Sequence, residues 1–256
     1  MRQIGVAVKT PRFDHQRHEK PYRLPEQIPY NGDGPAGRWV RMGQSPMYDL
    51  GPELEHATVD PGTNILVSGP PLTGKRKLAL EILAEGAASG QGSVVVTTRD
   101  SSDRVLADLR SVFADPETAD IGVVDCVRKH QGRSASDTDA VKHASSPTDM
   151  TGIGIKFSEF VEEFYAAGVR KNRVWLDSLT TLLLYSDLQT VFRFMHVFTS
   201  RIEDADAVGV HLIESTAHDA ETNNTLKQLF DGVIEVSHER EVTVRMPGVD
   251  TGVAGT

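Results

Sequence analysis

Short apolar runs and helical patterns alternate along most of this chain. Strand-like runs rich in Val, Ile and Leu occupy residues 64–68, 93–98, 121–127, 174–179 and 208–214. Between most of them, apolar residues recur at the three- and four-residue spacing of amphipathic helices. This alternation predicts an α/β fold, with a mostly parallel sheet flanked by helices. Two further apolar runs, at 231–237 and 241–246, are joined by a short polar turn and predict a C-terminal β-hairpin.

Two helical segments carry apolar stripes that would face this sheet. The stripes consist of Phe157, Phe160, Val161 and Phe164 in the first segment, and of Val191, Met195, Phe198 and Ile202 in the second. A stripe packed on a sheet accounts for these aromatic residues, so we expect them in the core and not around a cofactor.

The region before the first strand has a different composition. Residues 1–46 are rich in Pro, Gly, His and charge, and they predict an irregular extension in which only residues 4–8 favour an edge strand. Residues 47–56 are expected to form a short helix at the edge of the domain. The folded domain is therefore predicted to span residues 47–248, with a tail at 249–256.

A polar segment interrupts the alternation after the third strand. Residues 128–150 are rich in Ser, Asp and Lys and predict a flexible surface insertion, so deleting residues 134–145 should leave the fold intact. The segment begins with basic residues, from Arg128 to Arg133. These are interpreted as part of a solvated loop, with contact to a phosphate or a protein partner as the alternative.

Composition restricts the class of partner. The net charge of −9 disfavours nucleic acid, because such binding depends on neutralising phosphates with Lys and Arg. The acidic excess and the preference for Arg over Lys resemble the composition of proteins from halophilic archaea. Cys126 is the one cysteine and lies in an apolar run, which predicts a buried thiol. The apolar runs are too short for a membrane span or a signal peptide, so a cytoplasmic location is expected.

A phosphate-binding loop follows the first strand. Residues 69–75 read Gly-Pro-Pro-Leu-Thr-Gly-Lys and match the pattern G-x-x-x-x-G-K between an apolar strand and a helix. Backbone N–H groups and the positive end of the helix dipole can bind phosphate oxygens there, while the lysine contacts the terminal phosphates. The predicted nucleotide-binding residues are Gly69, Pro70, Pro71, Leu72, Thr73, Gly74, Lys75 and Arg76.

Arg76 departs from this pattern. The residue after the lysine is normally Ser or Thr, whose hydroxyl is a ligand of Mg²⁺, whereas a guanidinium has no acceptor atom. Either a metal is held without this ligand, or Arg76 itself neutralises phosphate charge. We expect the side chain to point into the site; the alternative is that it points to solvent along the helix.

Asp177 ends the apolar strand at 173–177 and stands where a Walker B aspartate would be. There it can hold Mg²⁺ or help to orient a nucleophile, and we take it as the candidate metal ligand and as a catalytic candidate. Capping of the strand end is the simpler alternative.

Taken together, these motifs resemble the KaiC-like branch of the RecA superfamily of P-loop ATPases, closest to archaeal members. The resemblance rests on the phosphate loop and on residues 94–97, 173–179 and 231–236. It implies a RecA-type core, ATP as the ligand, and a homo-oligomer in which the nucleotide lies between subunits.

The resemblance also marks departures on the catalytic path. The family's water-polarising glutamates align with residues 97–100, where Asp100 is the carboxylate that remains. The family's late basic element, which reaches a neighbour's γ-phosphate, matches Arg245. A sensor polar group would stand at residues 214–216, with Ser215 and Thr216 as the candidates. Ordinary surface charge is the alternative for Asp100 and Arg245.

These residues predict an ATP-binding protein with a regulatory or signalling role, an unidentified protein partner, and weak or absent hydrolysis. An active ATPase, in which Asp100 or Glu214 activates water, is one alternative. A scaffold that binds no nucleotide is another, and a recombination mediator is disfavoured by the charge.

Overall fold

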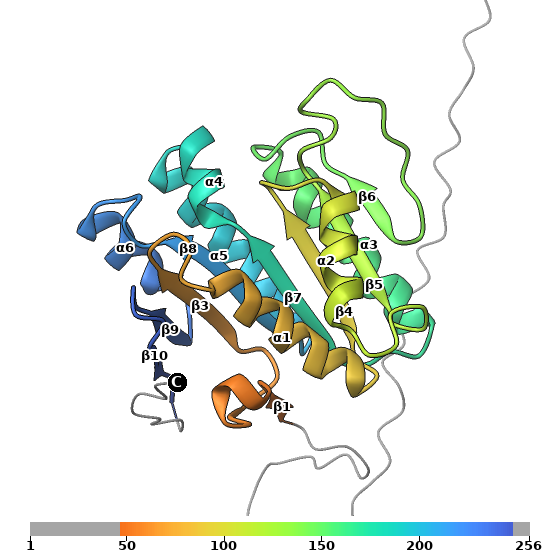
Figure 1. Cartoon of the computed structure of the whole chain (residues 1–256). Coiled ribbons are helices and arrows are strands. Elements are labelled where there is room, and N and C mark those ends of the chain that lie inside the picture. The colour runs from red at the N-terminus through yellow and green to blue at the C-terminus, as the bar shows by residue number, and fades with distance from the viewer. Residues whose placement is uncertain (1–46, 248–256) are drawn as a thin grey trace, which may run out of the picture. The chain divides into compact units, whose positions relative to one another are not determined.

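The apolar runs form the strands of an eight-stranded sheet in the computed structural model, which describes residues 47–247 (Figure 1). The strand order is β10-β9-β3-β8-β7-β4-β5-β6, and neighbouring strands are parallel except for the antiparallel pair β9–β10. The bounds are β3 (Asn64–Gly69), β4 (Gly92–Thr97), β5 (Ile121–Asp125), β6 (Val141–His143), β7 (Asn172–Asp177), β8 (Val208–Glu214), β9 (Gly232–Val236) and β10 (Val242–Arg245). The predicted α/β fold and its C-terminal hairpin are confirmed.

Helices cover both faces of this sheet. Figure 1 shows α1 (Lys75–Ala88) and α2 (Ser102–Val112) in front of it, and α3 (Met150–Ala166) and α5 (Leu188–Asp204) behind it. The short helices α4 (Leu179–Tyr185) and α6 (Ala220–Lys227) bury leucines in the same core cluster as α3 and α5. Both predicted stripes face the sheet, with Val161 partly buried and the other members fully or almost fully buried. Parallel strands covered on both faces explain the near-continuous apolar runs.

Residues 47–56 do not form the expected helix. They contain β1 (Tyr48–Asp49), which pairs with β2 (Thr58–Val59) across the short 3₁₀-helix η1 (Pro52–Leu54). Gly51 precedes this 3₁₀-helix and has φ 93°, a positive value that glycine adopts readily. Pro52 then occupies the first position of the 3₁₀-helix, where proline is favoured. The apolar side chains of the segment still pack in the core, because Tyr48 and Leu50 are buried.

The polar segment at 128–150 is also more structured than predicted. Residues 141–143 form β6, the edge strand that pairs with β5. Lys142, His143 and Ala144 are buried, and Lys142 Nζ lies 5.0 Å from the centroid of the Phe160 ring while pairing with Glu163 at 2.7 Å. The prediction of a surface insertion is therefore wrong for residues 141–144. A lysine counts as polar in a sequence pattern. It can nevertheless lie in an edge strand when its aliphatic stem is buried and its ammonium group is paired with a carboxylate.

The predicted extension at 1–46, with its edge strand at 4–8, and the tail at 249–256 lie outside the described residues. Within residues 47–247, no helix has the length and apolar character needed to cross a membrane. Cys126 is buried, as predicted, and burial raises the pKa of its thiol.

Candidate nucleotide-binding site

The phosphate loop joins β3 to α1 at the carboxyl edge of the sheet, where ligands of open α/β sheets usually bind. Two residues of the loop have left-handed backbone, Leu72 with φ 63° and Gly74 with φ 98°. Leu72 is 95% exposed, so its side chain points away from the protein. Pro70 and Pro71 have no N–H group, which leaves the backbone from Leu72 to the first turn of α1 as the source of phosphate donors.

Lys75 begins α1 and is buried beneath this loop. Its ammonium group donates to the carbonyl oxygen of Pro70, to Thr73 Oγ1 at 3.4 Å, and to Glu214 Oε2 at 2.9 Å. Glu214 is the last residue of β8, directly opposite Gly69 in the parallel register of β3 and β8. The lysine of the loop is thus held by the loop itself and by a carboxylate from the neighbouring strand.

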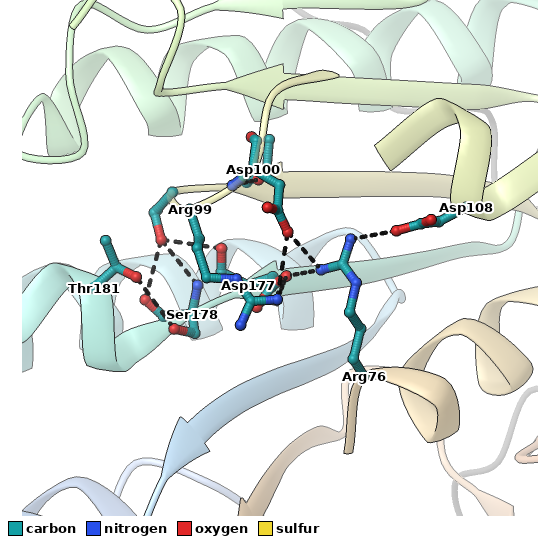
Figure 2. A network of polar contacts seen from close by, with 9 residues as sticks. Arg76, Arg99, Asp100, Asp108, Asp177, Ser178 and Thr181 are labelled. Atoms are coloured by element: carbon teal, nitrogen blue, oxygen red, sulfur yellow. Dashed lines mark hydrogen bonds and ion pairs between the residues drawn. The ribbon is translucent and has the colours of Figure 1, made fainter. Parts of the chain in front are cut away.

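Arg76 points into the site, as expected, and forms the centre of a cluster of acidic side chains (Figure 2). Its Nη1 contacts Asp177 Oδ2 and lies 3.4 Å from Asp100 Oδ2, while its Nη2 donates to Asp108 Oδ2 at 2.8 Å. The guanidinium carbon also lies 4.8 Å from the centroid of the Trp175 ring. One cation beside the phosphate loop therefore joins carboxylates from β7, α2 and the segment after β4.

Asp177 lies at the end of β7 and is 1% exposed. Burial raises the pKa of this carboxyl, although Arg99 and Arg76 lie close enough to lower it. Its Oδ1 atom is buried without a hydrogen-bond partner among the described residues. Ser178, the next residue, is joined to Asp177 by a cis peptide bond and donates its N–H to Thr98 Oγ1 at 2.9 Å. Asp177 is thus a buried acid that faces two arginines.

Asp100 is placed beside Asp177 by the turn after β4. Its N–H donates to Thr97 Oγ1 at 3.1 Å, and Thr97 Oγ1 in turn donates to the Asp100 carbonyl oxygen at 2.7 Å. Arg99 Nη2 lies 3.4 Å from one carboxylate oxygen of each aspartate. The structure therefore brings the candidate site residues Asp100, Asp177 and Arg76 together, and adds Arg99.

Residues of this cluster do not fit a magnesium ion in the arrangement seen here. The hydroxyl ligand expected after Lys75 is replaced by a guanidinium, which has no acceptor atom for a metal and contacts one of the two Asp177 carboxylate oxygens. Among residues 47–247, no group of three or more His, Cys, Asp or Glu side chains is arranged to hold a metal ion. The metal role predicted for Asp177 stays a prediction, and the geometry favours Arg76 as the cation at this place.

Arg245 is not part of this cluster. It lies on β10 at the edge of the sheet, where it is exposed and its Nη2 is 3.4 Å from Glu235 Oε2. Its predicted role at a neighbouring subunit stays a prediction. The candidate sensor residue Ser215 lies next to the loop, because it donates its N–H to the carbonyl oxygen of Gly69 at 2.9 Å.

Asp108 was missed by the sequence analysis. It lies in α2, 32 residues from Arg76 along the chain, and the local pattern is that of an ordinary amphipathic helix. The sequence feature that could have indicated Asp108 is its position in the helix after β4, the strand that ends shortly before Asp100. The sequence likewise does not predict Glu214 as the partner of Lys75; it suggests Glu214 only as an activator of water in the alternative of an active ATPase.

A cavity adjoins the first residues of the phosphate loop. It has a volume of about 530 Å³ and lies between α6 and the hairpin β9–β10. Its lining includes Gly69 and Pro70 of the loop and the polar side chains of Ser215, Asn223 and Ser237. The volume falls in the range of small-molecule sites, roughly 300–1,000 Å³.

The sheet order, the loop after β3 and the acid at the end of β7 define a RecA-like P-loop fold. Solved structures agree: the KaiC-like protein PH0186 from the hyperthermophilic archaeon Pyrococcus horikoshii OT3 matches with a TM-score of 0.52 and 15% sequence identity. The match covers 80% of this chain and 86% of that chain. The chain belongs to DUF7504, a family of unknown function whose model matches residues 62–236. A comparison with curated proteins found no match.

Proposed function

We propose that this protein binds ATP and ADP through residues 47–248 and acts as a nucleotide-dependent regulatory protein with slow or absent hydrolysis. The observation that carries the proposal is the position of Arg76. Its guanidinium lies beside the phosphate loop and contacts Asp177 and Asp108, so a permanent cation stands where a P-loop ATPase uses a hydroxyl and a metal. An internal cation supports phosphate binding without a bound metal.

Slow hydrolysis follows from the pairing of every candidate base. A general base must accept a proton from water or orient it beside the reacting phosphate. Asp100 lies 3.4 Å from both Arg76 and Arg99, and Glu214 lies 2.9 Å from Lys75. Carboxylate oxygens that already accept hydrogen bonds from cations are less available to contact an attacking water.

The regulatory part of the proposal concerns what nucleotide binding changes. A ligand shifts a conformational or assembly equilibrium only if it binds one state more tightly than the other. A second copy of this chain, contributing Arg245, and an unidentified protein partner are the candidate responders. Nucleic acid remains disfavoured by the net charge of −9, and a cytoplasmic location is part of the proposal.

A thermal-shift titration with ATP and with ADP tests nucleotide binding. Ligand at a hundred times its dissociation constant should stabilise the wild-type protein by about 2.7 kcal/mol. Lys75→Ala should lose most of this stabilisation, because one charge-assisted phosphate contact is worth roughly 1.5–3 kcal/mol. Lys77→Ala is the matched control, since Lys77 lies on the same helix and its side chain is 72% exposed. Equal titrations for Lys75→Ala and wild type would remove Lys75 from the site.

A scaffold that binds no nucleotide is a second candidate, and one observation favours it. Lys75 already donates to Pro70, Thr73 and Glu214, so the loop satisfies its own lysine. The same titration decides between the two, because the scaffold predicts no shift in melting temperature with either nucleotide, with or without Mg²⁺.

A further inference from the structure

We infer that Glu214 is a specificity-determining residue that makes the phosphate loop favour a nucleoside diphosphate over a triphosphate. The inference rests on the proposed function, namely that the loop binds a nucleotide. It starts from the fixed position of Glu214. Its N–H donates to Thr180 Oγ1 at 2.8 Å, and the next N–H, that of Ser215, donates to Gly69 at 2.9 Å. These two bonds hold the backbone of Glu214 beside the first residue of the loop, and the Glu214 carboxylate bonds Lys75 from there.

Lys75 has no donor left for a third phosphate while Glu214 is bound. An ammonium group has three N–H donors, and Lys75 contacts an acceptor atom on each of Pro70, Thr73 and Glu214. The backbone N–H groups of the loop and of the start of α1 can bind the terminal phosphate of a diphosphate next to the charge of Lys75, while the lysine keeps its contact with Glu214. The third phosphate of a triphosphate needs an N–H donor from Lys75. This phosphate must therefore either displace Glu214 from the lysine or lie against the Glu214 carboxylate.

The neighbouring cations Arg76 and Arg99 offset only a part of this repulsion, because both also pair with carboxylates. Arg76 is engaged by Asp177, Asp100 and Asp108, and Arg99 lies 3.4 Å from both Asp177 and Asp100. Asp177, Asp100 and Asp108 outnumber Arg76 and Arg99 by one carboxylate, and the pair of Lys75 and Glu214 leaves this surplus unchanged. A triphosphate adds a negative charge to this surplus, whereas a diphosphate ends in the N–H groups of the loop.

Isothermal titration of ADP and of the non-hydrolysable analogue β,γ-methylene ATP, both in EDTA, tests the inference. Wild-type protein should bind ADP about tenfold or more tightly than the analogue. Glu214→Gln keeps the shape and removes the charge, so it should lower the Kd of the analogue by about tenfold and change that of ADP by less than about threefold. Glu81→Gln is the matched control, because Glu81 pairs with Lys77 at the same 2.9 Å on the outer side of α1. It should behave as wild type.

The outcomes separate the inference from the proposed function. An unchanged ratio of the two Kd values in Glu214→Gln, with both ligands still bound, would overturn the inference alone. Failure of wild type to bind either ligand would overturn the proposed function, and the inference with it. If Glu214→Gln does not fold, titration of wild type with inorganic pyrophosphate and with tripolyphosphate decides: preference for pyrophosphate supports the inference, and equal affinity overturns it.

Discussion

Single residues at the end of β7 and beside the loop set the electrostatics of the site. Asp177 is 1% exposed, and removing a partner from a buried carboxylate leaves an uncompensated charge. Arg76 and Arg99 share this carboxylate, and Arg76 also pairs with Asp108. The cluster therefore stabilises Asp177 in its charged form against the burial that raises its pKa. A Ser or Thr at position 76 would leave that task to a metal ion.

Another single residue, His211, predicts how the stability of the protein depends on pH. His211 is fully buried in β8 and burial lowers its pKa to about 3, so it stays neutral in the folded protein between pH 7 and 5. In the unfolded chain it gains a proton below its ordinary pKa of about 6.5. Stability should therefore fall as the pH drops from 7 to 5, by about 2 kcal/mol from this residue. Urea unfolding at both pH values measures the loss.

The variant His211→Leu isolates that contribution. It removes the titrating group and its contact with Asn64 Oδ1 at 3.1 Å, so it lowers stability at pH 7 but should show a smaller loss between pH 7 and 5. His196→Asn, at an exposed position of α5, should retain the wild-type loss. Equal pH dependence in His211→Leu and wild type would show that His211 does not carry the effect.

At the scale of elements, β6 gives a prediction that corrects the sequence analysis. Replacing residues 141–144 with a Gly-Ser linker of equal length should destabilise the protein by about 2–3 kcal/mol, because it removes buried side chains and the pairing with β5. The same replacement of residues 133–136, which are mostly exposed, should change stability by less than about 0.5 kcal/mol. Urea unfolding of both variants compares them. Similar stabilities would mean that β6 contributes little.

The elements that sequence could predict are those with a strong local pattern. The central strands and the helices α3 and α5 have continuous apolar runs or clear stripes, and the phosphate loop has a defined spacing between a strand and a helix. The elements that it missed are short or polar. β1 and β2 have two residues each, and β6 buries Lys142 and His143 through contacts with α3 and Asp137. Such contacts depend on distant segments, which local periodicity does not contain.

The candidate site divides in the same way. Lys75, Arg76 and Asp177 follow from motifs at strand ends, because the carboxyl ends of parallel strands meet at one edge, whereas Asp100 follows from the family resemblance. The ion pairs between these site residues cannot be predicted from the motifs, since they depend on the directions in which the side chains point. The contact of Arg76 with Asp108 and that of Lys75 with Glu214 join residues that the motifs treat separately.

On the scale of the whole molecule, the phosphate loop, the acidic cluster and the cavity of about 530 Å³ lie along one edge of the sheet. An ordinary P-loop protein brings positive charge to this edge with its nucleotide, as bound Mg²⁺. Here the chain itself supplies that charge through Arg76. The central claim is therefore that nucleotide binding needs no divalent metal.

Isothermal titration of ADP and ATP into wild type and Arg76→Thr, first in EDTA and then with Mg²⁺, tests this claim most directly. The substitution restores the hydroxyl that ligates the metal in other P-loops and removes the internal cation. Wild-type affinities should differ by less than about threefold between the two conditions, whereas Arg76→Thr should gain about tenfold or more on adding Mg²⁺. The same dependence on Mg²⁺ in both proteins would contradict the assignment of Arg76 as the internal cation of the site.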